Sequence, residues 1–166
     1  MEKILVTGGC GFIGTNLIPA LLKSNYKVLS IDTQYFGNFL SKHKNLTNLK
    51  ISVKDLNNSH LKKVKYVIHL AAISNDPAAL LDSKITWETN VLNTYHLLEL
   101  CKKNKIKKFL FASSGSVYGV SKNKKVTEST NLLPISDYNK TKMIGEKIVE
   151  RYKKHFDTII LRPGTV

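Results

Sequence analysis

The stretch Thr7-Gly8-Gly9-Cys10-Gly11-Phe12-Ile13-Gly14 directly follows an apolar run at 3–6 and leads into an amphipathic helical pattern. Its glycines fit a general dinucleotide-binding spacing at 9, 11 and 14, and a short-chain variant at 8, 11 and 14. In such a unit the glycines permit a tight turn, close approach of backbone N–H groups to a phosphate, and packing of the helix on the strand. The helix N-terminus then faces the anion with free N–H groups. The stretch therefore predicts a pyrophosphate site held by Gly8, Gly11 and Gly14.

A second strand-like run, Val28-Leu29-Ser30-Ile31, ends in an acid, Asp32. A carboxylate at this point accepts hydrogen bonds from the adenosine ribose hydroxyls and repels a 2′-phosphate. Since no arginine stands beside Asp32 to receive that phosphate, the pattern favours NAD over NADP as the cofactor. The alternatives are that the glycines form an ordinary turn and that Asp32 is only a strand-end residue.

The composition is typical of one globular domain. The chain has 166 residues, 42% hydrophobic and 23% charged. No apolar run approaches the length that crosses a bilayer, so no membrane partner is expected. Met1-Glu2-Lys3 leads at once into a strand-like run, which argues against a signal peptide. Cys10 and Cys101 stand in unrelated contexts and suggest no disulfide framework, so the expected location is cytoplasmic, and no metal site is expected.

The net charge of +14 raises the question of a nucleic-acid partner. The basic clusters lie at 102–108, 122–125 and 151–155. These lysines fall at expected helix C-terminal ends or in a loop, where cations suit the helix dipole. No aromatic residues alternate with them as a base-stacking platform requires. The sequence therefore argues against nucleic-acid binding.

Apolar runs alternate with helical patterns along the whole chain. Strands are expected at 3–7, 27–31, 48–52, 65–70, 107–112 and 157–161, and helices near 12–24, 56–62, 82–104 and 137–155. The expected apolar helix faces are Leu17, Leu21 and Leu22; Val91, Leu92, Tyr95 and Leu98; and Ile144, Ile148 and Tyr152. This alternation predicts an α/β fold, a Rossmann-like doubly wound parallel sheet of order 3-2-1-4-5-6. The polar stretch at 33–47 is expected to be a surface loop on the adenosine side.

A second group of residues points to proton transfer. The fifth expected strand delivers Ser114 at its C-terminal end, and Tyr138-x-x-x-Lys142 places two side chains on one face of the last helix. A phenol with a pKa of ~10 is a poor base, but an ammonium at roughly 4 Å could lower that pKa by up to ~3 units. Tyr138 is then the acid/base, Lys142 its electrostatic partner and a ribose ligand, and Ser114 an orienting donor. The alternative is that Tyr-x-x-x-Lys marks a solvated helix face.

Taken together, these motifs show that the chain resembles an extended short-chain dehydrogenase/reductase of the NAD-dependent sugar-nucleotide epimerase/dehydratase family. The motifs that match in order and spacing are residues 7–14, Asp32, Asp55-Leu56, His69-Leu70-Ala71-Ala72, Asn90, residues 113–119, Tyr138-x-x-x-Lys142 and residues 161–164. The resemblance covers the whole chain.

The resemblance implies further roles for individual residues. Phe12 and Ile13 are expected to line the pyrophosphate turn, and Ser114 occupies the catalytic Ser/Thr position. His69 is expected to pack under the sheet rather than bind a ligand. The resemblance also implies contacts with the rest of the cofactor. These are Asp55 and Leu56 beside the adenine, Leu70, Ala71 and Ala72 beneath the cofactor, and Asn90 near the nicotinamide ribose.

Three departures from the family pattern affect the expected chemistry. Family dehydratases carry an Asp-Glu pair where this chain has Gly115 and Ser116, which argues against 4,6-dehydration. Thr165 replaces an Asn that often contacts substrate. The family continues for about as many residues again beyond the position of Val166, so residues 1–166 are expected to be an NAD-binding domain without the C-terminal substrate lobe.

Two functions are therefore considered. The first is NAD-dependent epimerisation or reduction of a nucleoside-diphosphate sugar, with Tyr138 moving the proton and a homodimer as the candidate assembly. The second is a non-catalytic NAD-binding module or remnant. The intact Ser114, Tyr138 and Lys142 favour an enzymatic lineage, whereas the expected lack of a substrate lobe favours the module.

Overall fold

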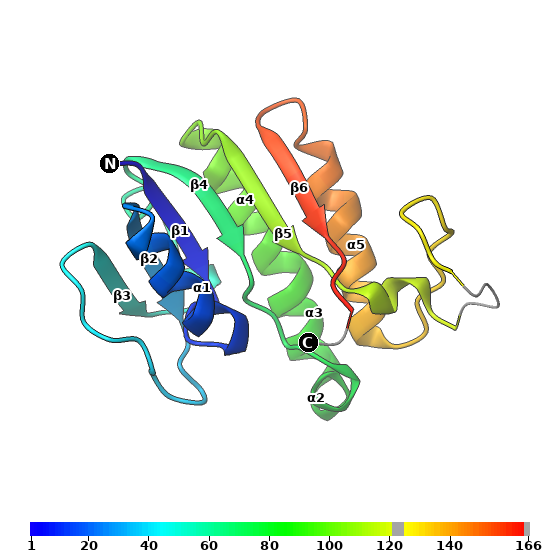
Figure 1. Cartoon of the computed structure of the whole chain (residues 1–166). Coiled ribbons are helices and arrows are strands. Elements are labelled where there is room, and N and C mark those ends of the chain that lie inside the picture. Colours follow the sequence, from blue (N-terminus) through cyan, green and yellow to red (C-terminus); the bar gives the residue numbers. More distant parts are fainter. Residues whose placement is uncertain (121–124, 165–166) are drawn as a thin grey trace.

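The computed structural model describes residues 1–120 and 125–164, and its centre is a six-stranded sheet (Figure 1). All pairings are parallel, and the order is β3-β2-β1-β4-β5-β6, which confirms the predicted fold and strand order. The strands are β1 (Lys3–Thr7), β2 (Lys27–Asp32), β3 (Leu46–Lys50), β4 (Val64–His69), β5 (Lys108–Ala112) and β6 (Asp157–Leu161). The third strand begins two residues before its predicted position.

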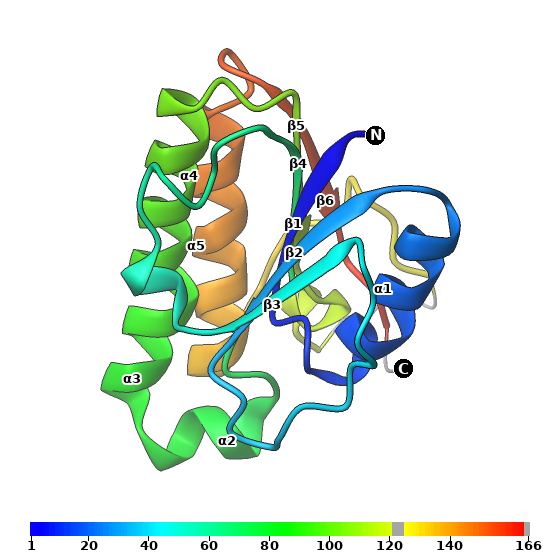
Figure 2. The same cartoon turned by 90° about the vertical axis from the view of Figure 1, so that its left-hand side faces the viewer.

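Helices cover the two faces of this sheet unequally (Figure 2). One face carries α1, whereas the other carries α4 and α5 side by side. The helices are α1 (Phe12–Lys23), η1 (Val53–Asp55), α2 (Asp76–Leu81), α3 (Ser83–Trp87), η2 (Glu88–Leu92), α4 (Asn93–Lys103), η3 (Gly115–Tyr118) and α5 (Asp137–Arg151). Ile159 and Leu161 of β6 are 37% and 48% exposed.

The helix predicted at 56–62 is wrong. The short 3-10 helix η1 ends at Asp55, before this stretch, and residues 58–63 form turns. Asn57 accepts hydrogen bonds from the backbone N–H and the hydroxyl of Ser59 at 3.0 and 2.6 Å. Short polar side chains that bond nearby backbone in this way favour turns over helix, so the local chemistry outweighed the apolar spacing.

The long helix predicted at 82–104 is present as the continuous run α3, η2 and α4, but it contains a π-helical turn in η2. The separate helix α2 precedes it and was not predicted; Asn75 caps it by accepting from the Ala78 N–H at 3.0 Å. The last helix ends at Arg151, earlier than the predicted residue 155, because residues 152–155 turn back toward β6.

Two apolar clusters form the core. The larger lies between the sheet and α4 and α5, and the smaller packs Ile18, Leu21 and Leu22 of α1 on β1 and β2. The predicted apolar face of the long helix is wrong in part, since Leu92 and Tyr95 are 61% and 51% exposed, whereas Leu98 is buried as predicted. The buried face of α4 is Thr94, Leu97, Leu98, Leu100 and Cys101. Most of these positions keep the 3.6-residue spacing of an α-helix, so the helix packs on the sheet with a neighbouring face.

Among the described residues, no helix is long and apolar enough to cross a membrane. Residues 122–124 of the second basic cluster and Thr165 lie outside the described residues.

Candidate functional site

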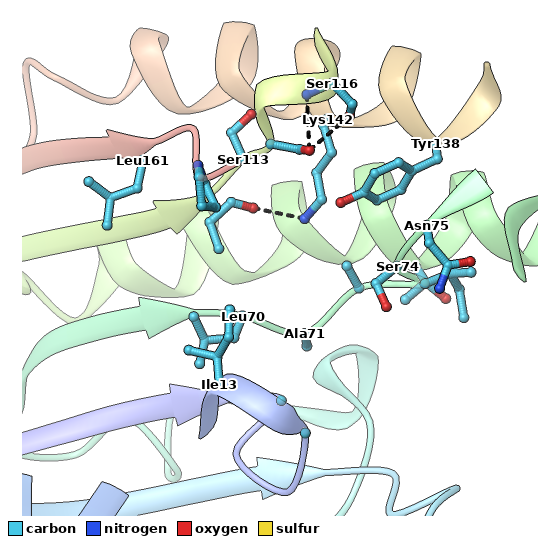
Figure 3. Close-up of a pocket in the computed structure, with 18 of the residues that line it drawn as sticks. Ile13, Leu70, Ala71, Ser74, Asn75, Ser113, Ser116, Tyr138, Lys142 and Leu161 are labelled. Carbon is cyan, nitrogen blue, oxygen red and sulfur yellow. Dashed lines mark hydrogen bonds between the residues drawn. The ribbon is translucent and has the colours of Figure 1, made fainter. Parts of the chain in front are cut away.

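A cleft of about 1820 Å³ lies at the carboxyl edge of the sheet. It brings together the glycine turn after β1, the end of β2, the segment after β4, the turn after β5 and the first turns of α5. The predicted site residues that line it are Gly8, Gly11, Phe12, Ile13, Gly14, Asp32, Leu70, Ala71, Ala72, Ser114, Tyr138 and Lys142. Figure 3 shows Ile13, Leu70 and Ala71 on one side, and Ser113, Ser116, Tyr138 and Lys142 on the other. Residues far apart in the sequence therefore meet in one site.

The glycine turn can be formed only with glycine at two of its positions. Gly8 has a φ of +72°, and a Cβ there would lie 2.7 Å from the Ala71 nitrogen. A Cβ on Gly14 would lie 2.5 Å from the Gly9 oxygen. The turn ends at Gly11, which begins α1 with no side-chain cap and no acid in the first turn. The N-terminus of α1 thus keeps its N–H groups and positive end for an anion.

Asp32 is fixed at the end of β2 by two backbone donors. One carboxylate oxygen accepts from the Cys10 N–H at 3.0 Å, and the other accepts from the Gln34 N–H at 2.6 Å. Each carboxylate oxygen has a second lone pair, so Asp32 can still accept from a ligand hydroxyl. Asp32 therefore ties the second strand to the glycine turn and presents an acceptor in the cleft.

Three predicted cofactor contacts do not line the cleft: Asp55, Leu56 and Asn90. Leu56 is 2% exposed and belongs to the core, and Asp55 accepts from the Ser52 N–H at 3.1 Å to cap η1. The cleft at this end is lined instead by Ile51, Ser52 and Val53, and by the aromatic residues Tyr35 and Phe36 of the loop after β2. The sequence predicted that the loop at 33–47 lies on the adenosine side, but its two aromatic residues were not recognised as cleft residues.

Asn90 lies in the π turn and is 3% exposed. Its amide nitrogen donates to the Ile73 oxygen and to Thr141 Oγ1, both at 3.0 Å, and its amide oxygen accepts from the Ile73 N–H at 2.8 Å. These bonds use both amide hydrogens and one lone pair of the amide oxygen, so Asn90 holds the segment after β4 against α5. The resemblance to the family singled out Asn90, and its place near the nicotinamide ribose stays a prediction.

Tyr138 and Lys142 stand one turn apart near the start of α5, and their polar ends point toward each other in the cleft (Figure 3). Lys142 Nζ lies 5.9 Å from the centre of the Tyr138 ring and donates to the Ala112 oxygen at 2.8 Å. Burial lowers the pKa of Lys142 to about 8. Such a lysine can change its charge near neutral pH, whereas an exposed lysine stays protonated.

The predicted fall of the Tyr138 pKa is wrong for this structure. Burial raises the pKa of Tyr138 and is the largest influence on it. A hydrogen bond from Ser114 lowers that pKa, and the Asp76 carboxylate raises it, with a net rise. The sequence argument counted the attraction of an ammonium for the phenolate but left out the cost of placing a phenolate out of water.

Ser114 is oriented by its neighbour two residues on. Ser114 Oγ accepts from the Ser116 N–H at 3.2 Å and from Ser116 Oγ at 2.8 Å. Since both of these bonds use Ser114 as acceptor, its own proton is directed elsewhere, toward Tyr138 or a ligand oxygen. Ser116 was noted in the sequence only as the replacement of a carboxylate, and this contact was missed.

His69 packs beneath the sheet, as predicted. It is 2% exposed, and its ring nitrogens bond Thr7 Oγ1 at 2.6 Å and Thr94 Oγ1 at 2.9 Å. Burial, together with the nearby Lys142 charge, lowers the pKa of His69 to about 3. No cluster of His, Cys, Asp or Glu with the geometry of a metal site occurs in the described part of the chain.

A comparison with protein-family models matches residues 4–166 to the NAD dependent epimerase/dehydratase family. The chain belongs to this family. Membership confirms the resemblance inferred from the motifs and makes NAD the cofactor of the family to which the site belongs. Family members are sugar-nucleotide epimerases and dehydratases of the short-chain dehydrogenase type.

Individual relatives agree with this family membership. A Bacillus subtilis protein named as an uncharacterised UDP-glucose epimerase is 39% identical, over 99% of this chain and 56% of its own length. The UDP-N-acetylglucosamine 4-epimerase of Methanobrevibacter ruminantium, in complex with UDP-N-acetylmuramic acid, superposes with a TM-score of 0.92 at 34% identity, over 97% of this chain and 54% of that one. The Bacillus cereus UDP-glucuronic acid 4-epimerase, in complex with UDP-glucuronic acid and NAD, superposes with a TM-score of 0.87 at 33% identity, over 97% of this chain and 56% of that one. The chain thus spans about half the length of the relatives that it matches.

Proposed function

We propose that this chain binds NAD in the cleft and forms the cofactor-binding part of an enzyme that epimerises or reduces a nucleoside-diphosphate sugar. The observation that carries the proposal is the convergence of Ser114, Tyr138 and Lys142 at the carboxyl edge of the sheet, opposite the glycine turn. Solved relatives of this family carry UDP-sugars and NAD in their crystals, which supports both ligands.

The residues present fit the proposed cofactor. The uncapped N-terminus of α1 suits a pyrophosphate, and the free lone pairs of Asp32 suit ribose hydroxyls. Lys142 supplies a donor for the second ribose when it exchanges its bond to Ala112. When bound, NAD supplies the hydride acceptor for a sugar carbon.

The chain's own groups would handle the proton. Tyr138 Oη takes the proton of the sugar hydroxyl as the carbon beneath it is oxidised, and returns that proton when the carbon is reduced. Ser114 donates a hydrogen bond to the same sugar oxygen. The hydrogen bond from Ser114 favours the phenolate, which offsets part of the rise in the Tyr138 pKa caused by burial.

Epimerisation or reduction is favoured over 4,6-dehydration. Dehydration needs additional acid and base groups next to the catalytic hydroxyl, and this chain has Gly115 and Ser116 at those positions. The cleft also contains Asp76 and Glu128, but Asp76 accepts from Ser136 and neither carboxylate adjoins Ser114 in the sequence. Which sugar is used depends on residues that contact it.

The finer expectation of a homodimer is also a proposal. It is supported by the groove between α4 and α5, where the apolar side chains of Tyr95, Ile144 and Ile148 lie among charged residues of both helices. A second copy of the chain would cover these apolar side chains. Light scattering of the wild type and of Tyr95→Glu tests it, because the variant should shift the mass toward that of a monomer.

The function is tested with purified protein, NAD and a panel of UDP- and TDP-hexoses. We expect residues 1–166 to bind NAD weakly by calorimetry and to convert no hexose by themselves, and we expect conversion, detected by chromatography, when a substrate-binding lobe is joined to them. In that longer protein, Tyr138→Phe should keep the NAD affinity and lose conversion, because only the proton-transfer group is removed. NAD binding without any conversion by the longer protein would favour the non-catalytic module, and conversion by Tyr138→Phe at the wild-type rate would contradict the role of Tyr138.

A further inference from the structure

A buried polar cluster lies directly behind Ser114. The Glu146 carboxylate is 1% exposed, and the Arg162 guanidinium reaches it through two bonds, Nε to Oε1 at 2.9 Å and Nη2 to Oε2 at 2.7 Å. Ser113 Oγ also donates to Glu146 Oε1. Arg162 Nη1 donates to Tyr118 Oη at 2.8 Å, and the guanidinium lies 5.1 Å from the centre of the Tyr118 ring. None of these four residues has a place in the mechanism above.

The cluster joins every element that carries a reacting group on this side of the cleft. Ser113 directly follows β5 and precedes Ser114, and Tyr118 ends η3, the turn that contains Ser116. Glu146 lies on α5 one turn beyond Lys142, which is itself one turn beyond Tyr138. Arg162 directly follows β6. A single bidentate pair therefore links the turn of Ser114 to the helix of Tyr138.

The direction of the Ser113 side chain bears on that of Ser114. Successive side chains in an extended segment point to opposite sides. Ser114 is extended, with φ −152° and ψ 146°. Ser113 also borders the cleft, but its Oγ is held toward α5 by Glu146, so the Ser114 side chain is turned the other way.

Stability alone is a weak reason for such a pair. Burying a carboxylate and a guanidinium costs desolvation free energy that their attraction only about repays, and apolar replacements of similar volume are often as stable. A bidentate arginine–carboxylate pair does, however, fix the relative orientation of the groups that carry it. The three elements around Ser114, which are the turn η3, the helix α5 and the end of β6, need such a fixed relative orientation.

We propose that Glu146 and Arg162 are positioning residues, which act through Ser113 and Tyr118 to hold the Ser114 hydroxyl against Tyr138 Oη. The proposal rests on the proposed function in one respect, that Tyr138 is the group that transfers the proton. The geometric part, the alignment of Ser114 with Tyr138, can be measured in the absence of any turnover.

The first test observes the Tyr138 phenol itself. The protein is labelled with tyrosine carrying ¹³C at Cζ, and the Tyr138 signal is identified by its loss in Tyr138→Phe. Ser114→Ala gives the shift that follows from loss of the Ser114 hydrogen bond. We expect Glu146→Gln to move the Tyr138 signal in the same direction. Glu150→Gln is the matched control, since Glu150 lies one turn further along α5 in an exposed pair with Lys147 and should leave the signal in place.

A second variant separates positioning from folding. Glu146→Met combined with Arg162→Met removes both charges and leaves no unpaired ion, so the fold should be retained, with a thermal midpoint close to that of the wild type. We still expect the Tyr138 signal to be displaced, because Ser113 and Tyr118 have lost their partners. In a protein that converts sugars, kcat should fall by roughly tenfold or more with KM and NAD affinity little changed.

The outcomes are distinct. An unmoved Tyr138 signal in the folded double variant would overturn the positioning role whether or not the wild type turns over. A displaced signal in the double variant, together with a wild type that binds NAD but converts no sugar even with a substrate-binding lobe, would support the alignment while contradicting the proposed enzymatic function.

Discussion

Lys142 donates from Nζ to the backbone oxygen of Ala112 at 2.8 Å, and no ion pair within the described residues includes Lys142. The side chain is 5% exposed. A buried ammonium held only by a carbonyl is poorly compensated for lost hydration, which is why the pKa of Lys142 falls to about 8. The site therefore keeps, at the expense of stability, a cation ready for a ligand.

Replacement of Lys142 should change the stability of the protein and its NAD affinity in opposite directions. We expect Lys142→Met to raise the free energy of unfolding at pH 7 by about 1–3 kcal/mol, because a buried charge is replaced by an apolar chain of similar length. The same variant should bind NAD more weakly, since a ribose donor is lost. Urea denaturation and calorimetry measure the two effects. Lys140→Met, on the exposed side of the same helix, should change neither, and a Lys142→Met protein less stable than wild type would contradict this account.

The stabilising effect of Lys142→Met should depend on pH. Lys142 has a pKa of about 8 when folded and 10.5 as its ordinary value, so between these the unfolded chain binds more protons than the folded one. The wild type should then gain stability as pH rises from 8 to 10.5, relative to the variant. Urea midpoints of both proteins at several pH values check this, and a constant difference between them would argue against it.

The lowered pKa of the buried His69 side chain predicts that the protein loses stability in acid. Its pKa is about 3 when folded, against an ordinary value of 6.5, so the unfolded chain gains a proton first. The stabilisation is complete above pH 6.5 and is lost as pH falls toward 3, up to about 4 kcal/mol from this residue. His69→Gln, which cannot be protonated, should have a flatter acid profile in circular dichroism. The exposed His155→Gln should follow the wild type.

Asp32 should decide between the two nicotinamide cofactors. Calorimetry of the wild type should give NAD binding several-fold tighter than NADP binding, because the carboxylate accepts from ribose hydroxyls and repels a 2′-phosphate. Asp32→Ala should narrow the ratio of the two affinities. It should also loosen the glycine turn, since the Cys10 N–H loses its acceptor. Equal NAD and NADP affinities in the wild type would refute the assignment.

The glycine turn offers a steric test. Gly14→Ala places a methyl group 2.5 Å from the Gly9 oxygen, so we expect a destabilised protein with reduced NAD binding. Gly164→Ala is the matched control, because a Cβ there meets no atom within 4 Å. Thermal denaturation and calorimetry of the two variants give the comparison, and equal behaviour would mean that the turn can shift to accept a side chain.

The sheet and the meeting of Tyr138 with Lys142 were predictable from the sequence because they depend on local patterns. The glycine fingerprint at the start of six alternating strands predicted the order of the sheet, and the i, i+4 spacing predicted that Tyr138 and Lys142 share a helix face. Features that depend on packing were not predictable. The buried side of α4 depends on what packs against the helix, and the raised pKa of Tyr138 follows from burial. Leu56 lies in the core because η1 ends there, which no motif spacing reveals.

The π turn at Glu88–Leu92 also constrains how this helix can change length. Each residue of an α-helix advances the chain by about 100° around the axis. Deletion of one residue from this turn would swing Asn90 away from Ile73 and Thr141, and would rotate everything before it relative to α4. Insertions and deletions should therefore be absent from this segment among relatives that keep the Asn90 contacts, even where the amino acids around it are freely exchanged.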